Sequence, residues 1–591
     1  MDIITDSKDS ARERSIENIE RAAKLYVVSE YETKNESAPS EITIGELKSK
    51  GYIQNTDEDE NNKVFVYMND TDYIFYYEGR DNLKDYKTLK SLIESDTNHI
   101  KRNVVVNGNT VNKVYGTKDE QLTMNNYVLY SGQLWEVVET NDTNNTIKLV
   151  SAASLTSIAY GETNDWNASW VKKWLNEYFY SKLERIDLIK YTEFCVDPVD
   201  VTPDSYTKMT SCTNKVTEKV GLLTYEDYIY ALDASTIQDG RSYLDEDELS
   251  WLITPTNNGT KQIWHTKNET PSYITTVIHL TKSNGLGVRP VISIKDNVLV
   301  KSGNGTKIDP YILSSERSLK KNTKLNLGKV GDYVYLDESN NPYVTEIDEI
   351  YIKKISNKTS TSKVRYRIVE INSDGSIKVE RADVLKNLPM GSISVHNNTA
   401  LFFYSLDTGD GLTSCLSNYN KKYGEEGLSN DNYYIGGCPG HGIYNPNEGS
   451  GDYKFNTGQN IGYYLNNAPN GFYNWYSGKS KKMILLTTYN IYESAGSKDY
   501  STLSIKASVD AKVILPNVGE MYSSNDIKAS YWHTNVSEAE DLVDVTEGSA
   551  ITYQAKFLYG WNSARPVVTL SPNIYVTSGD GTVMNPYALD I

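Results

Sequence analysis

"RPVISIKDNVLVKSGNGTKIDPYIL" (residues 289–313) recurs near the end of the chain as "RPVVTLSPNIYVTSGDGTVMNPYAL" (residues 565–589). Aligned without a gap from positions 288 and 564, the two stretches are identical at 12 of 26 positions, including Arg-Pro and both glycines of Ser-Gly-Asn/Asp-Gly-Thr. In each stretch the first apolar run predicts a buried strand and the next run predicts its partner strand. The glycines, which adopt positive φ readily, predict a tight turn. We therefore expect the same β-rich ending in two parts of the chain.

Three weaker similarities precede both endings, and they occur in the same order. They pair "LWEVVETNDTNNTIKLV" with "RYRIVEINSDGSIKVE", "KWLNEYFY" with "YYLNNAPNGFYNWY", and "KVGLLTYEDY" with "KVILPNVGEMY". A turn reused by chance would not bring ordered neighbours with it, so the pattern indicates a duplicated domain. We expect the first copy over residues 119–315 and the second over residues 325–591, enlarged by a Tyr/Asn/Gly-rich insertion. A chain of 591 residues has room for several such domains.

Helical patterns complete the expected fold. Apolar residues recur at helical spacing between charges over residues 16–27, which predicts an amphipathic helix. Trp170, Trp174 and Tyr178 predict a second, core-facing helix. The expected fold class is therefore α+β: an N-terminal amphipathic helix with a small head over residues 1–118, then two tandem β-rich domains.

Charge and composition exclude some partners. Lys and Arg number 60 against 78 Asp and Glu, a net charge of −18, which argues against nucleic acid or anionic lipid because both require a basic face. No apolar run of about 18 residues predicts a membrane span. Tyrosine is abundant, with 47 Tyr against 9 Phe and 9 Trp. Tyr-rich surfaces suit recognition, although Tyr is also common in β-strands.

The four cysteines form two pairs that are local in sequence, Cys195 with Cys212 and Cys415 with Cys438. We predict two disulfides, each stabilising its loop by about 3 kcal/mol in an oxidising compartment. A zinc site is the less favoured alternative, because no CxxC occurs and only His441 lies near a cysteine. We expect no metal and no cofactor.

No residue has a clear catalytic pattern. HExxH, GxSxG, the Walker A motif and dinucleotide glycine patterns do not occur. "IWHT" (263–266) and "YWHT" (531–534) are better explained as structural segments than as parts of a catalytic site. The repeated Arg289-Pro290 and Arg565-Pro566 are expected to be structural, with each arginine buried against a loop carbonyl or a carboxylate. We therefore predict that the protein is not an enzyme.

Two resemblances add to these predictions. "SARERSIENIERAAKLYVVSEY" with "EITIGELKSKGYI" resembles the region after the membrane helix of type IV pilin-like proteins from Gram-positive bacteria. This implies an extracellular, cell-surface ectodomain without its membrane helix, with pilin subunits or a surface anchor as partners of the N-terminal helix. "LWEVV", "WLNEYFY", "LLTYEDY", "WLITPT" and "VRPVISI", in that order, resemble a Firmicute extracellular domain of unknown function. The ending is similar to endings in C-type-lectin-like folds, which implies lectin-like tandem domains, and no catalytic residues transfer.

Together these observations predict a surface-displayed, pilin-like adhesin that binds a glycan or a protein through its distal copy. Aromatic side chains stack on sugars and peptides, and each also suits loop packing. The candidate ligand-binding residues are Tyr433, Tyr434, Phe472, Tyr473, Asn474, Trp475, Tyr476, Tyr531, Trp532 and Trp561. The alternatives are a pilus subunit or spacer without ligand and, with least support, a secreted hydrolase that depends on His265 or His533.

Overall fold

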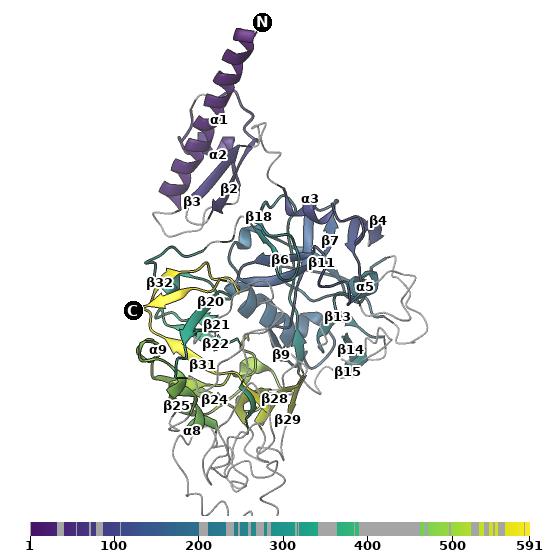
Figure 1. The fold of residues 1–591 in the computed structure, drawn as a ribbon. Coiled ribbons are helices and arrows are strands. Elements are labelled where there is room, and N and C mark those ends of the chain that lie inside the picture. The colour runs from purple at the N-terminus through teal and green to yellow at the C-terminus, as the bar shows by residue number, and fades with distance from the viewer. Residues whose placement is uncertain are drawn as a thin grey trace, which may run out of the picture.

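The chain is mostly β. In the computed structural model the described residues are 2–31, 39, 41–54, 56–69, 72–77, 87–106, 108–199, 211–231, 242–245, 249–257, 262–266, 277–280, 285–313, 316, 318–340, 363–382, 385–388, 461–466, 471–495, 498–521, 531–536, 543–547, 550–553, 562–583 and 585–591. Strands make up 40% and helices 21% of this part, and the strands are divided among many small sheets (Figure 1). The expected α+β class, with a helix and pilin-like head as its helical part, is therefore wrong.

The physical reason is that the predicted core-facing helix folds into short pieces. The aromatic run that starts at Trp170 changes its hydrogen-bond pattern twice, from α4 (Trp170–Lys173) to the π-helical η4 (Trp174–Phe179) and then to the 3-10 helix η5 (Tyr180–Lys182). Its large side chains are still buried, because the spacing of apolar residues specifies a buried face and not the length of a helix.

One long helix lies at the N-terminus. α1 (Asp2–Glu30) packs against a sheet of order β1-β2-β3 (Glu41–Thr43, Lys63–Asn69 and Asp72–Tyr77) and against α2 (Ile44–Ser49) (Figure 1). The apolar side chains on one face of α1 are buried in a small core of their own. No helix among the described residues is both long and apolar enough to cross a membrane.

The first copy is built on a nine-stranded sheet. The order is β10-β17-β8-β7-β6-β19-β18, with β5 also paired to β7 and β4 paired to β5. The strands are β4 (Ile100–Val106), β5 (Asn109–Val114), β6 (Tyr127–Tyr130), β7 (Gln133–Asn141), β8 (Thr146–Ser151), β10 (Ile189–Lys190), β17 (Val291–Lys295), β18 (Val300–Ser302) and β19 (Tyr311–Leu313). β4 and β5 precede residue 119, where we expected the first copy to begin, yet their hydrogen bonds join them to its sheet.

The second copy repeats this plan in a five-stranded sheet of order β20-β21-β22-β31-β26, and the chain ends in the pair β32-β33. The strands are β20 (Tyr333–Asp337), β21 (Lys363–Ile371), β22 (Ile377–Arg381), β26 (Val513–Ile514), β31 (Val567–Leu570), β32 (Tyr575–Ser578) and β33 (Ala588–Asp590). Each copy has its own apolar core.

Smaller sheets accompany each main sheet. In the first copy they are β9 (Thr156–Ile158) with β16 (Leu286–Val288), β11 (Thr192–Cys195) with β12 (Lys215–Glu218), and β13 (Trp251–Pro255), β14 (Gln262–His265) and β15 (Val277–Leu280). In the second they are β24 (Thr487–Tyr492) with β25 (Ile505–Ala511), and a sheet of β23 (Leu385–Leu388), β30 (Asn562–Ala564), β27 (Tyr531–Val536), β28 (Val543–Glu547) and β29 (Ala550–Tyr553).

Short helices connect these strands. They are α3 (Leu89–Ile93), η3 (Trp166–Ala168), η6 (Ile186–Leu188), α5 (Tyr225–Tyr230), η7 (Leu325–Leu327), α8 (Ile461–Asn466), η11 (Phe472–Trp475), α9 (Gly478–Met483) and η12 (Tyr500–Thr502).

The two main sheets share the same register. Glu139 faces Lys148 directly after a bulge in β7, and Glu370 faces Lys378 directly after a bulge in β21. A one-residue slip would move every side chain to the opposite face of the sheet, so the shared bulge keeps this Glu–Lys pair in the same place in both copies.

The repeated ending differs from the prediction in its pairing. We expected the strand that follows Arg289-Pro290 to pair with the next strand, but β17 lies between β8 and β10, so both of its edges are occupied. β18 instead pairs with β19 across the glycine turn. Gly303 and Gly305 have φ of 92° and 82°, as predicted for that turn. A Cβ atom on Gly303 would lie 1.9 Å from the Pro310 carbonyl oxygen, so this turn requires glycine.

Candidate functional site

A polar pocket lies in the first copy. Its walls come from β5, β7, β8 and β17, from the hairpin β11–β12, and from the start of α5. The space in and in front of the pocket, open solvent included, is about 700 Å³. Asn, Thr, Glu and Lys side chains dominate the lining, so the pocket suits a polar ligand.

The floor of the pocket is a buried network of four charges. Asp227 accepts hydrogen bonds from Lys113 at 3.0 Å and from Lys148 at 3.0 and 3.2 Å. Glu139 forms an ion pair with Lys113, and its carboxylate lies 3.7 Å from the Lys148 ammonium. None of the four side chains is more than 10% exposed. Two cations and two anions neutralise one another within this network, and Glu226, which is 4% exposed, adds a further carboxyl group to the lining.

Local structure positions each of these charges. Glu139 and Lys148 face each other after the bulge in β7, and Lys113 reaches them because β5 pairs with β7. Asp227 completes a capping box at the start of α5, where its carboxylate accepts from the Thr224 amide and its own amide donates to the Thr224 hydroxyl. The carboxylate therefore binds both the helix end and the lysines.

Electrostatics keeps two of these groups, Asp227 and Lys113, ionised. Burial alone would raise the pKa of Asp227, but the charges of Lys148 and Lys113 outweigh it and hold the pKa well below its ordinary value. Burial alone would lower the pKa of Lys113, but Glu139 and Asp227 raise it above the ordinary range. Asp227 and Lys113 thus stay charged across the physiological pH range.

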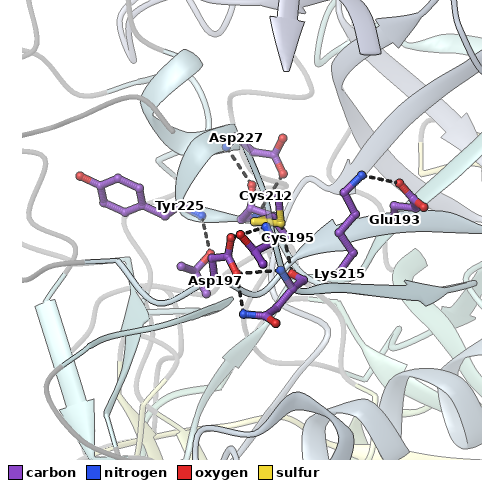
Figure 2. Close-up of a disulfide and its surroundings, with 11 residues drawn as sticks. Glu193, Cys195, Asp197, Cys212, Lys215, Tyr225 and Asp227 are labelled. Carbon is purple, nitrogen blue, oxygen red and sulfur yellow. Dashed lines mark hydrogen bonds and ion pairs between the residues drawn. A yellow bond between two sulfur atoms is a disulfide. The ribbon is translucent and has the colours of Figure 1, made fainter. Parts of the chain in front are cut away.

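The rim is the hairpin β11–β12, closed by the disulfide between Cys195 and Cys212 (Figure 2). This is the first of the two predicted disulfides, and it is confirmed. Glu193 and Lys215 form an ion pair of 3.0 Å across the hairpin. Asp197 comes close to both sulfur atoms, but these are bonded to each other and offer no thiolate to a metal ion.

Tyr191 is the aromatic residue at the rim. Its side chain lines the pocket and is 67% exposed. The ammonium of Lys219 lies 4.3 Å from the centre of the ring, donates to the Ile189 carbonyl, and so holds the ring in place. An exposed ring with one supported face is suited to stacking on a ligand.

In the second copy the corresponding groups are covered by the first copy. Lys378 binds Glu520, and Glu520 accepts from the Asn517 amide as Asp227 accepts from Thr224. The Trp174 indole donates to the carbonyl of Gly519 at 2.9 Å, the residue before Glu520. Glu370, the counterpart of Glu139, is bound by Lys182 of the first copy at 3.0 Å. The pocket is therefore open in the first copy and filled by a neighbouring domain in the second.

Most described candidate residues of the distal copy lie in its core. Phe472, Trp475 and Tyr476 are 0%, 2% and 0% exposed, so these rings are not on the surface where a ligand could stack. Tyr473 and Asn474 are half-buried: the Tyr473 hydroxyl accepts from Lys512, and Asn474 accepts from Lys481.

The other candidates are only partly described. Tyr531 and Trp532 lie on β27, and nothing is described of their side chains. Tyr433, Tyr434 and Trp561 fall outside the described residues, as do Cys415 and Cys438, so the second predicted disulfide remains a prediction.

The repeated Arg-Pro residues occupy the scaffold. Arg289 is 2% exposed, donates to the carbonyls of Ser151 and Leu244, and forms an ion pair of 2.8 Å with Glu136. The Pro290 carbonyl accepts from the Ser151 amide. These contacts tie β17 to β7 and β8.

The second copy differs in the partner of its arginine. Arg565 is fully buried and lies 4.0 Å from Glu380. The Pro566 carbonyl accepts from the Arg381 amide, which occupies the place of Ser151. Arg381 forms a second buried ion pair, with Glu338 at 3.0 Å.

The two histidine segments lie on strands that do not correspond. His265 is on β14 and His533 on β27, and each ring hydrogen-bonds a backbone carbonyl through Nδ1. Burial lowers the pKa of His533 to about 4. These contacts explain both histidines structurally.

Sequence reasoning missed the pocket. One signal was present: Glu139 and Lys148 recur as Glu370 and Lys378 in the ordered similarities. Asp227 recurs in the same way as the acidic residue Glu520, whereas Lys113 precedes the ordered similarities and gives no such signal. Comparisons with protein-family models, curated proteins and solved structures found no match to this chain.

Proposed function

We propose that the chain is a surface-displayed, pilin-like adhesin without enzymatic activity, and that it holds its ligand in the pocket of the first copy. The observation that carries the proposal is the pocket itself, which has a floor of paired buried charges, a polar wall and Tyr191 exposed at its rim. Such a site suits hydroxyl and amide groups, which donate and accept hydrogen bonds, so the ligand is a glycan or a polar protein surface.

Two further observations support display outside the cell. The disulfide between Cys195 and Cys212 is typical of proteins that fold in an oxidising compartment. The N-terminal segment, with its resemblance to type IV pilin-like proteins, would supply the attachment to pilin subunits or a surface anchor through α1 (Asp2–Glu30).

This proposal moves the binding site from the distal to the first copy. Phe472, Trp475 and Tyr476 are buried in the distal core, and the Trp174 indole of the first copy binds the Gly519 carbonyl beside Glu520. The corresponding groove in the first copy is open.

A spacer without ligand is the second candidate function. It is favoured by the contacts that tie the copies together, such as Lys182 with Glu370 and Trp174 with the Gly519 carbonyl. A pair of domains held in one orientation would extend a fixed distance from the cell surface.

An array of glycans and host proteins probed with the whole chain tests the proposal. We expect binding to at least one ligand, and we expect Tyr191→Ala to weaken it about tenfold because the stacking surface is lost. Tyr575→Ala is the matched control, since Tyr575 is 36% exposed but lies on β32 of the second copy. Equal loss in both variants would contradict a first-copy site. A chain that binds no ligand at all would favour the spacer.

A further inference from the structure

A cluster of buried charges joins the two copies where the linker enters the second one. Glu316 of the linker accepts from the Ser131 amide in the turn between β6 and β7, and its other oxygen lies 3.4 Å from the Gly132 nitrogen. The same carboxylate accepts from the Lys329 ammonium at 2.6 Å. Glu316 and Lys329 are each 7% exposed. One carboxylate therefore bridges the first copy and the second.

The backbones of the two copies are in direct contact at this junction. A Cβ atom on Gly132 would lie 2.7 Å from the Val330 carbonyl oxygen, and one on Gly331 would lie 2.5 Å from the Gly132 carbonyl oxygen. Both glycines have positive φ. Arg367 adds a hydrogen bond to Gln133 from the second copy. Contact this close leaves no room for a side chain at either glycine. Because it also excludes water, a net charge buried at this junction is costly.

Asp332 lies beside this contact and is 3% exposed. Its carboxylate accepts from the Lys329 amide at 3.1 Å and lies 3.9 Å from the Lys329 ammonium. The charges of Glu184 in the first copy and of Glu316 both act to raise the pKa of Asp332. The charge of Asp332 in turn acts to raise the pKa of Tyr587. Lys329 and Arg367, which is 3% exposed and donates to Gln133, are thus the two cations described at this junction, and they face three carboxyl groups.

The first copy has a neutral residue at the corresponding position. The Val137 amide donates to the Asn126 carbonyl just as the Ile368 amide donates to the Asp332 carbonyl, both at 2.8 Å. Asn126 is also 3% exposed. The duplicated fold therefore accepts an amide at this position, and the ionisable carboxyl occurs in the copy that forms the junction.

We propose that Glu316, Lys329 and Asp332 form a proton-controlled lock that holds the two copies together while Asp332 is neutral and loosens when Asp332 ionises. With Asp332 neutral, Glu316 and Glu184 are balanced by Lys329 and Arg367. With Asp332 ionised, one negative charge at the junction has no balancing cation among these groups.

The direction of the response follows from linkage. Burial raises the pKa of Asp332 to about 7; Lys329 opposes the rise, and Glu184 and Glu316 add to it. The closed junction therefore binds a proton that the opened junction releases. Its stability is greatest in acid, falls as the pH rises from about 4 towards 7, and is constant above that range.

Hydrogen exchange of the whole chain tests this lock. The quantity to measure is the exchange rate of the peptides that contain Gly132 and Gly331, in the natural protein relative to Asp332→Asn at each pH, so that the intrinsic pH dependence cancels. One released proton predicts that this ratio rises by up to about tenfold per pH unit between pH 5 and 7 and then levels off. A ratio that does not change with pH would overturn the proposal.

Two further variants make the test specific. Asn126→Asp places the same carboxyl in the first copy, away from the junction, and should leave the Gly331 peptide unchanged. Glu316→Gln leaves Lys329 to pair with Asp332 and should move the step to lower pH, even if Asp332→Asn folds poorly. A step that stays at the same pH in Glu316→Gln would contradict the role of the cluster.

Discussion

The two copies contain corresponding hairpins that are held in different ways. β11–β12 of the first copy has four residues in each strand and is closed by a disulfide, whereas β24–β25 of the second is longer and packs its connecting loop on the first copy. Ala495, Tyr500 and Leu503 of that loop join the core of the first copy, and Lys173 donates to Ser501 at 2.9 Å.

This difference shows what a hairpin needs in order to be stable. Two strands alone are only marginally stable, so a hairpin requires either burial against a neighbour or a covalent link. The second copy has a neighbouring domain on this side, and the first has an open pocket. The same comparison applies to the buried lysines, because Lys148 lies under the pocket and Lys378 lies at a domain contact.

The largest expected effect on the free energy of unfolding comes from replacing the buried lysines Lys148 and Lys378 one at a time. Lys148→Met leaves Asp227 and Glu139 with a single buried cation and should destabilise the first copy by about 3–5 kcal/mol. Lys378→Met should cost the second copy about 1 kcal/mol, because Glu520 is 25% exposed and can be hydrated. Denaturant unfolding, with hydrogen exchange in β8 and β22 to separate the copies, measures both. Equal losses of unfolding free energy in the two variants would show that the deeper burial of the Lys148 ion pairs does not make them more important for stability than the Lys378–Glu520 pair.

The second effect concerns the disulfide. Replacing Cys195 and Cys212 by serine should cost the first copy about 3 kcal/mol in unfolding free energy and should open β11–β12, since no neighbouring domain supports it. The β24–β25 hairpin should not change. Reduction of the natural protein should reproduce the effect, and the same reductant should not affect β11–β12 further in the serine variant. A hairpin that stays protected in the serine variant would show that burial of Phe194 in the core of the first copy is sufficient to hold it.

The third effect depends on pH. The pKa of His533 is lowered by burial to about 4, so its neutral form is favoured in the folded state. The stability that this group contributes is complete above pH 6.5 and is lost as the pH falls towards 4, by about 3 kcal/mol. The first copy has Leu252 at the corresponding place, because Ile253 binds the Leu223 carbonyl as Thr534 binds that of Pro516.

His533→Leu should therefore remove this acid sensitivity. Hydrogen exchange of β27 is the suitable measurement, because Asp332 responds to pH in the opposite direction and would mask the effect in global unfolding. Identical acid profiles of the variant and the natural protein at β27 would contradict the assignment.

Local pattern in the sequence predicted a substantial part of the fold. The glycine turns, the amphipathic N-terminal helix and the disulfide between Cys195 and Cys212 follow from spacing and residue type, which act within one turn or one hairpin. The fold class was wrong because the spacing at Trp170 fixes which face is buried and not how long the helix is.

The site could not be predicted in the same way. Phe472 and Trp475 have the composition of a recognition surface but are buried, because η11 lies against the sheet of the second copy. Lys113 and Asp227 are 114 residues apart in sequence and meet only because β5 joins the sheet beside β7. No local pattern distinguishes such residues from solvated charges.

By itself, the sequence determined that the chain contains the same β-rich unit twice, with the same Glu–Lys pair after the same bulge, because register and turns depend on neighbouring residues. Only the tertiary structure decided that the groove of one copy is open and that of the other is filled. The physical reason is that a groove is occupied or free according to which domain packs against it, and that packing depends on contacts between residues far apart in the chain.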